Sequence, residues 1–178
     1  MIGNIRQWRR SDRATRPTEV MLDASFILTL YSLEANDERD QCRKFYNEEL
    51  KGKVTIYVSE WVVNEALHKT EKAFEKIARA RPDHQGPAKA QMIGQLMHFF
   101  DQRTQPLVPS AAQACNIRRM AAQLRSVHAP SLGVTDTYII ATGIVMQKTN
   151  IVGSDRKWGR VGTVRFWKMP RVDFVVDI

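Results

Sequence analysis

Residues 20–25 read VMLDAS, and the interpretation of the whole chain works outward from this stretch. Its three apolar residues predict a short buried strand that runs directly into Asp23. The apolar residues from Phe26 to Leu30 then predict a helix from Ser25 to Tyr31. An aspartate at such a junction is either the N-cap of the helix or a functional group at a strand end. Because apolar residues flank Asp23 on both sides, we expect it to be buried, which favours function.

Further along the chain, predicted strands alternate with predicted helices. Helices are expected at 36–50, 59–80, 88–103, 110–128 and 136–147. Strands are expected at 54–58, 107–109, 151–152 and 164–167, with a further candidate at 173–178. This alternation predicts an α/β layered fold with a mostly parallel sheet.

Length and composition favour one folded domain. The 178 residues are the size of a single compact domain, and 43% apolar content is enough to bury a core. Apolar runs all stop far short of the ~20 residues of a membrane-spanning helix, so a soluble, cytoplasmic protein without a membrane partner is expected. Cys42 and Cys115 lie far apart and form no C-x-x-C pair, which argues against zinc and a disulfide framework.

The charge balance favours an anionic partner. The chain carries 27 basic and 19 acidic residues, a net charge of +8, which puts nucleic acid first among partners. Residues 1–19 hold five arginines against Asp12 and Glu19 and lack an apolar period. We therefore expect a basic N-terminal extension over 1–19 that folds only on contact with something else, followed by one domain over 20–178.

Four acids lie near the junctions between these predicted strands and helices. Asp23 ends the first strand, Glu65 lies in the second turn of a helix that follows a strand, Asp136 begins a helix, and Asp155 closely follows residues 151–152. Ligands of open α/β sheets bind beyond the carboxyl ends of the strands, so these carboxylates are expected to converge there. Converging carboxylates repel unless a cation neutralises them, and oxygen-only ligands suit Mg²⁺ or Mn²⁺.

Each acid also has an ordinary structural interpretation. Glu65 has Lys69 four residues later, in the favourable orientation for a surface ion pair. Asp136 is a plausible helix cap, and Asp155 a plausible turn residue. Only the four acids taken together point to a site.

Four segments, in order, resemble the PIN-domain family over about residues 20–168. They are residues 20–25, where the strand ends at Asp23 before Ser25; residues 59–65, from Ser59 to Glu65; residues 135–142, around Asp136; and residues 151–158, around Asp155. The family usually has Thr two residues before the last Asp, whereas this chain has Gly153, and Ser154 is the neighbouring hydroxyl.

The resemblance implies a three-layer α/β/α fold and an Mg²⁺- or Mn²⁺-dependent endoribonuclease. Asp23, Asp136 and Asp155 would be metal ligands, and Glu65 would bind the metal directly or through water. Ser25 and Ser154 would hold the carboxylates or a water by hydrogen bonds. Many small members of the family are toxins of toxin–antitoxin pairs, so the resemblance also implies a homodimer and a cognate antitoxin.

The cations Arg156 and Lys157 directly follow Asp155, and we expect them to contact the RNA backbone on either side of the scissile bond. A phosphatase of the haloacid-dehalogenase type is a poor fit, because Ser25 stands where that family needs a second aspartate. A P-loop sequence is absent. The alternative that stays open is a non-catalytic PIN-like module that binds RNA or a protein.

Overall fold

The computed structural model describes residues 2–12, 14–33, 36–79, 86–128, 131–154, 158, 161–170 and 174–176. Its centre is a six-stranded sheet in the order β1-β6-β5-β2-β3-β4. The strands are β1 (Ile2–Asn4), β2 (Glu19–Leu22), β3 (Thr55–Ser59), β4 (Gln105–Leu107), β5 (Asn150–Gly153) and β6 (Arg165–Lys168). Every strand pairing in the described part of the chain is parallel, so the carboxyl ends of the strands share one edge.

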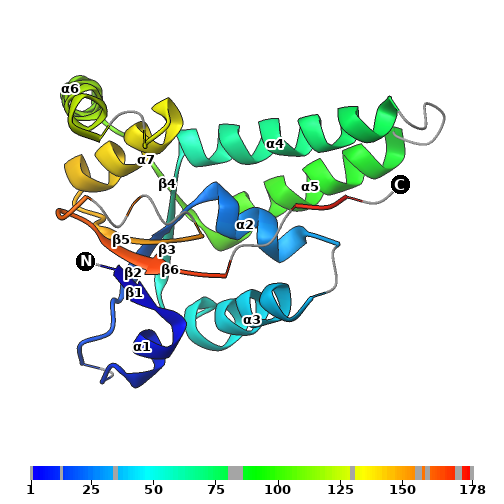
Figure 1. Cartoon of the computed structure of the whole chain (residues 1–178), viewed down its shortest axis with the longest axis horizontal. Coiled ribbons are helices and arrows are strands. Elements are labelled where there is room, and N and C mark those ends of the chain that lie inside the picture. The colour runs from blue at the N-terminus through cyan, green and yellow to red at the C-terminus, as the bar shows by residue number, and fades with distance from the viewer. Residues whose placement is uncertain are drawn as a thin grey trace.

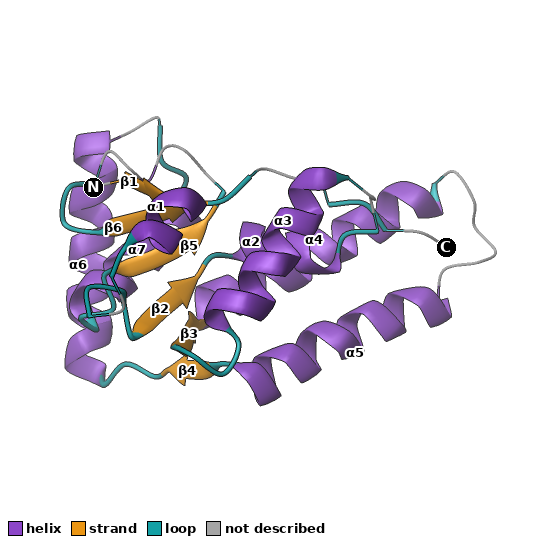
Figure 2. Cartoon of the chain, turned by 90° about the horizontal axis from the view of Figure 1, so that it is seen from below, coloured by secondary structure: helices purple, strands orange, loops and turns teal. Residues whose placement is uncertain are grey.

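Helices cover both faces of the sheet. They are α1 (Ile5–Arg10), α2 (Ala24–Tyr31), α3 (Asp37–Phe45) with its π-helical continuation η1 (Tyr46–Leu50), α4 (Glu60–Ala78), α5 (Gly86–Arg103), α6 (Ala111–His128) and α7 (Val134–Val145). Figure 1 shows α4, α6 and α7 above the sheet and α1 and α3 below it. Figure 2, seen from below, shows the strands side by side with the helices around them. The expected three-layer α/β/α fold with a parallel sheet is confirmed.

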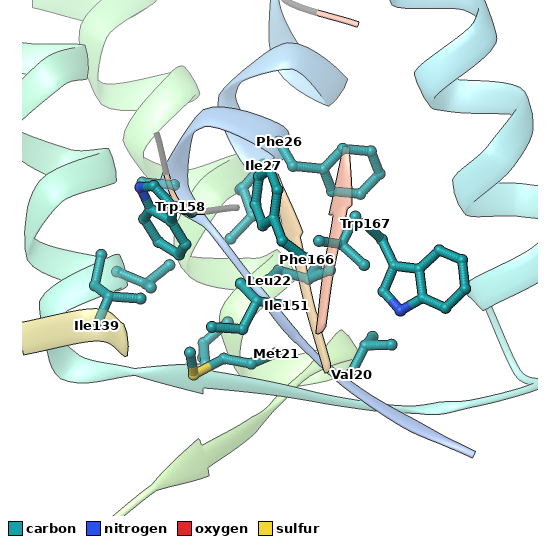
Figure 3. Packing of buried hydrophobic residues seen from close by; sticks show 14 of the residues in the cluster. Val20, Met21, Leu22, Phe26, Ile27, Ile139, Ile151, Trp158, Phe166 and Trp167 are labelled. Atoms are coloured by element: carbon teal, nitrogen blue, oxygen red, sulfur yellow. The ribbon is translucent and has the colours of Figure 1, made fainter. Parts of the chain in front are cut away.

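The core forms where β2 and α2 are buried together. Every residue from Val20 to Leu22 is at most 1% exposed, as expected of a central strand with both faces covered. Figure 3 shows their side chains in one cluster with residues of α2, α7, β5 and β6, including the fully buried Phe26 and Phe166. Burying side chains of this size contributes about 1.5–3 kcal/mol each. The strand–helix junction at Asp23 is therefore firmly held.

The register of β2 places Asp23 next to the end of β5. Met21 lies opposite Ile151, and Leu22 opposite Val152. One residue beyond the strand, the Asp23 N–H donates to the Val152 carbonyl at 2.8 Å. Asp23 and Gly153 therefore lie side by side at the carboxyl edge.

The expectation that residues 1–19 fold only on contact with something else was wrong for their first half. Residues 2–10 form β1 and α1, and β1 extends the sheet by pairing with β6. Trp8 is 1% exposed, with its ring edge-on to Phe45 and Trp167 at 5.4 and 4.8 Å. A three-residue strand and one buried aromatic residue give no apolar period, so the arginines dominated the sequence pattern.

Two of those arginines are paired with acids of η1. Arg16 Nη1 lies 2.8 Å from Glu49 Oε2, and Arg9 Nη2 lies 3.0 Å from Glu48 Oε2. Part of the positive charge of this segment is thus used within the fold. The positive charge of residues 1–19 is therefore weaker support for an external anionic partner than the sequence suggested.

The other boundaries differ in smaller ways. The strand expected at 107–109 is β4 at 105–107, and the helix expected from Asp136 begins at Val134. Residues 174–176, within the last expected strand, are not in a strand. They instead bond to the end of α2, where the Leu33 N–H donates to the Val175 carbonyl at 2.9 Å. Among the described helices, none is long and apolar enough to cross a membrane.

Candidate functional site

Asp23 is both a helix cap and a buried carboxylate. It precedes α2 as its N-cap, and its Oδ2 accepts hydrogen bonds from the Ser25 N–H, at 3.3 Å, and from the Ser25 hydroxyl. The residue is only 4% exposed. The two sequence interpretations of Asp23 are therefore combined in one residue, and the cap alone does not require such burial.

The electrostatics of Asp23 reveal which groups lie around it. Burial is the largest cause that raises its pKa from 3.8 to about 7. The hydrogen bond from Ser25 and the charge of Lys69 lower the pKa, whereas the charges of Glu65 and Asp136 raise it further. Acids of α4 and α7 thus act on Asp23 at the end of β2. The structure brings three of the four predicted acids into one neighbourhood.

Glu65 makes the expected pair with Lys69, but the pair is not an ordinary surface pair. Glu65 Oε1 lies 2.6 Å from Lys69 Nζ, and the Glu65 side chain is 16% exposed. Its other oxygen, Oε2, is buried and has no hydrogen-bond partner among the described residues. A buried carboxylate oxygen without a partner is rare and needs an explanation.

Lys69 faces the whole acidic group. Burial lowers its pKa, but the hydrogen bond and charge of Glu65, together with Asp23 and Asp136, outweigh burial and raise the pKa above its ordinary value. The ammonium group therefore supplies positive charge to three carboxylates at once. The i,i+4 spacing predicted only a surface partner for Glu65, since spacing does not tell which side of a helix is covered.

Asp136 lies in the first turn of α7. Its Oδ2 accepts a hydrogen bond from the Gly133 N–H at 2.9 Å, so it closes the helix start as the sequence suggested. The contact also fixes the direction of the carboxylate, which acts on both Asp23 and Lys69. Its capping role and its place beside the other acids are compatible.

Ser25 links the end of β2 to the end of β5. Its hydroxyl donates to Asp23 Oδ2 and accepts the Ser154 N–H at 3.1 Å. Ser154 is buried, and the bond that joins it to Ser25 comes from its backbone. At residue 153, a Cβ would lie 2.8 Å from Asp23 Cβ and 3.1 Å from its Oδ2. A side chain at residue 153 would therefore crowd Asp23, and the glycine that stands in place of the family's usual threonine leaves room for the carboxylate.

Part of the proposed metal site lies outside the described residues. Asp155, Arg156 and Lys157 lie outside the described residues, so their placement stays a prediction. Among the described side chains, no three histidines, cysteines or acids are close enough to hold a metal ion. The donor types nevertheless fit a hard divalent cation, because the carboxylates are partly or fully buried and Glu65 Oε2 lacks a partner.

One large hollow lies away from the acids. It has a volume of about 570 Å³ and is lined by residues at the amino ends of the strands, such as Thr18 and Thr55. It contains no acid, and it is at the edge of the sheet opposite Asp23. We therefore place the candidate site at the acids.

An aromatic pair near the acids was not predicted from the sequence. The rings of Trp61 on α4 and Tyr138 on α7 have centroids 4.3 Å apart and are tilted by 30°. Trp61 precedes Glu65 by four residues and so lies on the same face of α4. That spacing was the available signal, but the contact with Tyr138 joins two helices that are far apart in the chain.

The pKa of Asp23 predicts a pH-dependent gain in stability for Asp23→Asn. The pKa of Asp23 is about 7 in the folded protein and 3.8 as its ordinary value. The ionised carboxylate is therefore unfavourable in the fold, and the free energy of unfolding falls as pH rises from about 4 to about 7. In chelator at pH 8, the variant should be more stable by up to about 4 kcal/mol, with a smaller gain at pH 5. Denaturant unfolding at both pH values measures this. Asp101→Asn, at an exposed acid of α5, is the control, and an equal gain at both pH values would contradict the assignment.

The contact between residue 153 and Asp23 predicts that Gly153→Ala is destabilising. The added Cβ must displace Asp23, at about 1–3 kcal/mol. Gly94→Ala is a matched control, because a Cβ there meets nothing within 4 Å and α5 should gain up to about 1 kcal/mol. Thermal melts of both variants measure the difference. Equal stability of the two would mean that residue 153 has room for a side chain.

Comparisons with known proteins agree with this architecture. No family model and no curated protein matches the chain. Similar solved structures include VapBC2 from Rickettsia felis bound to a DNA fragment of its promoter, at 15% identity and a TM-score of 0.58, covering 85% of this chain and 98% of that one.

Two further solved structures have the same fold. FitAcB from Neisseria gonorrhoeae is 15% identical with a TM-score of 0.54, covering 84% of this chain and 96% of that one. VapC20 from Mycobacterium tuberculosis, described as a sarcin–ricin loop cleaving toxin, is 11% identical with a TM-score of 0.54, covering 80% and 95%. At these identities the likeness concerns the fold, and this chain has the fold of the PIN-domain toxins.

Proposed function

We propose that this protein is a metal-dependent endoribonuclease in which Asp23, Glu65, Asp136 and Asp155 form the catalytic and metal-binding group. The observation that carries the proposal is the buried carboxylate of Asp23 beside two other acids at the carboxyl edge of a parallel sheet. A strongly shifted pKa with specific charge partners is typical of functional sites. The fold shared with PIN-domain toxins supports the same reaction class.

Each described acid has a distinct part in the proposed site. Asp23 is held by Ser25, Asp136 is held by the Gly133 N–H, and Glu65 keeps Oε2 free as an acceptor. A bound Mg²⁺ or Mn²⁺ would supply an activated water and neutralise charge on the phosphate. The protein's own carboxylates would hold the cation and orient that water. Ser25 and Ser154 keep Asp23 in a single orientation through their shared hydrogen bonds.

The proposed substrate is RNA, and the proposed partners follow the toxin analogy. A net charge of +8 favours a polyanion, with Arg156 and Lys157 as the proposed backbone contacts. The similar structures of VapBC2 and FitAcB support an antitoxin partner and thus a toxin role. A homodimer is part of the same proposal.

The second candidate function is a non-catalytic RNA- or protein-binding module. Lys69 favours it, because its ammonium already neutralises part of the acidic group without a metal. If that ion pair is permanent, Glu65 is a structural residue and no cleavage follows. The two functions therefore make opposite predictions for Glu65 and Lys69.

Glu65→Gln separates the two functions by activity. A mixed RNA pool is incubated with the protein and either Mg²⁺, Mn²⁺ or chelator, and cleavage is followed on gels. We expect metal-dependent cleavage that falls roughly 100-fold or more in Glu65→Gln, since even residues that only support metal ligands contribute about 10–100-fold. Melting should change little. Glu75→Gln, at an exposed acid of the same helix, is the control, and Asp23→Asn should also be inactive. Full activity of Glu65→Gln would remove Glu65 from the site.

Lys69→Met tests whether a cation can replace the lysine. Without metal, the variant should melt at a lower temperature, because three carboxylates lose their nearby positive charge. With Mn²⁺, its stabilisation should exceed that of the unchanged protein, by about 1.4 kcal/mol for each tenfold gain in affinity. Lys72→Met, at an exposed position of the same helix, controls for general charge effects. If Mn²⁺ stabilises both proteins equally, Lys69 does not compete with a metal.

A further inference from the structure

Trp61 is the one tryptophan of four that reaches solvent. It is 39% exposed, whereas the other three are at most 1% exposed. Its ring lies against the ring of Tyr138, with the two centroids 4.3 Å apart. Each ring therefore holds the other in place before a partner binds. An aromatic side chain held rigid at the surface loses little conformational freedom when it binds a second planar group.

A small hollow opens beside this pair. It has a volume of about 190 Å³, and Trp61, Tyr138, Leu107, Ile117 and Arg118 are among its lining residues. Sites for drug-sized ligands are about 300–1,000 Å³, so this hollow suits a single planar ring system. Leu107, Ile117 and the two aromatic rings give it walls that favour stacking.

The hollow is close to the acidic group. Trp61 lies one helical turn before Glu65, about 5–6 Å away along the same face of α4. Tyr138 follows Asp136 by two residues on α7, and α4 and α7 are in contact. Figure 1 shows the start of α4 beside α7, and α7 in turn packs against α6. A nucleotide whose phosphate lies at the acids can therefore place its base in the hollow.

The surroundings of the hollow match a polyanion. Residues 102–135 contain no aspartate or glutamate, and α6 within them carries Arg118, Arg119 and Arg125, all exposed. Arg118 also lines the hollow, where a guanidinium can contact a phosphate or stack on a base. The one acid in the lining, Glu60, is an acceptor suited to the amino group of a base such as cytosine.

We propose that Trp61, Tyr138 and Arg118 frame a subsite for one unpaired RNA base next to the scissile phosphate, with Glu60 favouring bases that carry an amino group. The inference rests on the proposed ribonuclease function and adds the recognition of a single-stranded nucleotide to it. Stacking tolerates any base, because every base has an aromatic face. The preference therefore comes from the Glu60 carboxylate.

The test measures binding rather than cleavage. The full chain carrying Asp23→Asn is titrated in chelator with tetracytidylate and with an oligonucleotide of the same phosphate number that lacks bases. Tetracytidylate should quench tryptophan fluorescence, since only Trp61 is accessible, and should bind about tenfold more tightly than the abasic chain. Trp61→Ala should lose that advantage. Trp61→Phe should keep most of the affinity but lose the quenching. Tetrauridylate should bind more weakly than tetracytidylate.

The outcomes distinguish the subsite from the proposed function. Equal binding of the intact and abasic chains, without quenching, overturns the subsite even if the unchanged protein cleaves RNA. Absence of both binding and cleavage overturns the ribonuclease function itself, and the subsite with it. If Trp61→Ala alters the mass in sedimentation but not RNA binding, the aromatic pair is a contact between copies and the subsite is overturned. Equal affinity for the cytidine and uridine chains overturns the part assigned to Glu60.

Discussion

A carboxylate that is removed from water is unfavourable unless hydrogen bonds or a cation compensate it. The buried carboxylate of Asp23 therefore needs such partners from the elements that meet at the carboxyl edge of the sheet. Its hydroxyl partner comes from the first turn of α2, the lysine that lowers its pKa comes from α4, and its backbone partner comes from β5. The same carboxylate excludes any side chain at residue 153. Three elements are thus arranged around a single group whose own contribution to folding is unfavourable at neutral pH.

Lys69 shows how the fold tolerates its acids when no metal is present. Its ammonium bonds to Glu65 and offsets the charges of Asp23 and Asp136, yet 45% of its side chain is exposed. Because the lysine side chain is long, flexible and almost half exposed, it has room to move away from the carboxylates. An arrangement of this kind compensates the carboxylates while leaving Glu65 Oε2 unsatisfied. The unpaired oxygen, rather than the ion pair, is the feature that a purely structural role of Glu65 does not explain.

The sequence predicted the layers and three of the converging acids for a clear reason. Parallel strands put their carboxyl ends at one edge, so residues placed after strands meet there without any knowledge of side-chain contacts. It failed for Trp8, because a single buried residue in a six-residue helix leaves no periodic pattern. The inward direction of Lys69 and the contact of Trp61 with Tyr138 were also beyond it. Both depend on how helices distant in the chain pack, whereas sequence spacing defines only the face of one helix. Asp155 stays a sequence prediction.

The opposite charges at this edge constrain how an RNA strand can approach in the proposed function. The arginines of α6 attract phosphates over several ångströms, but the carboxylates beside them repel phosphates at close range, and added salt weakens both effects. Stacking on Trp61 and Tyr138 is short-ranged and largely insensitive to salt. In the proposed function, the cations therefore set the rate at which an RNA strand associates, and the aromatic pair sets the position at which it binds. A nucleotide held by its base can keep its phosphate near the acids, even though the carboxylates repel that phosphate. The uncharged aromatic pair would thus have a positioning role that further arginines could not fill.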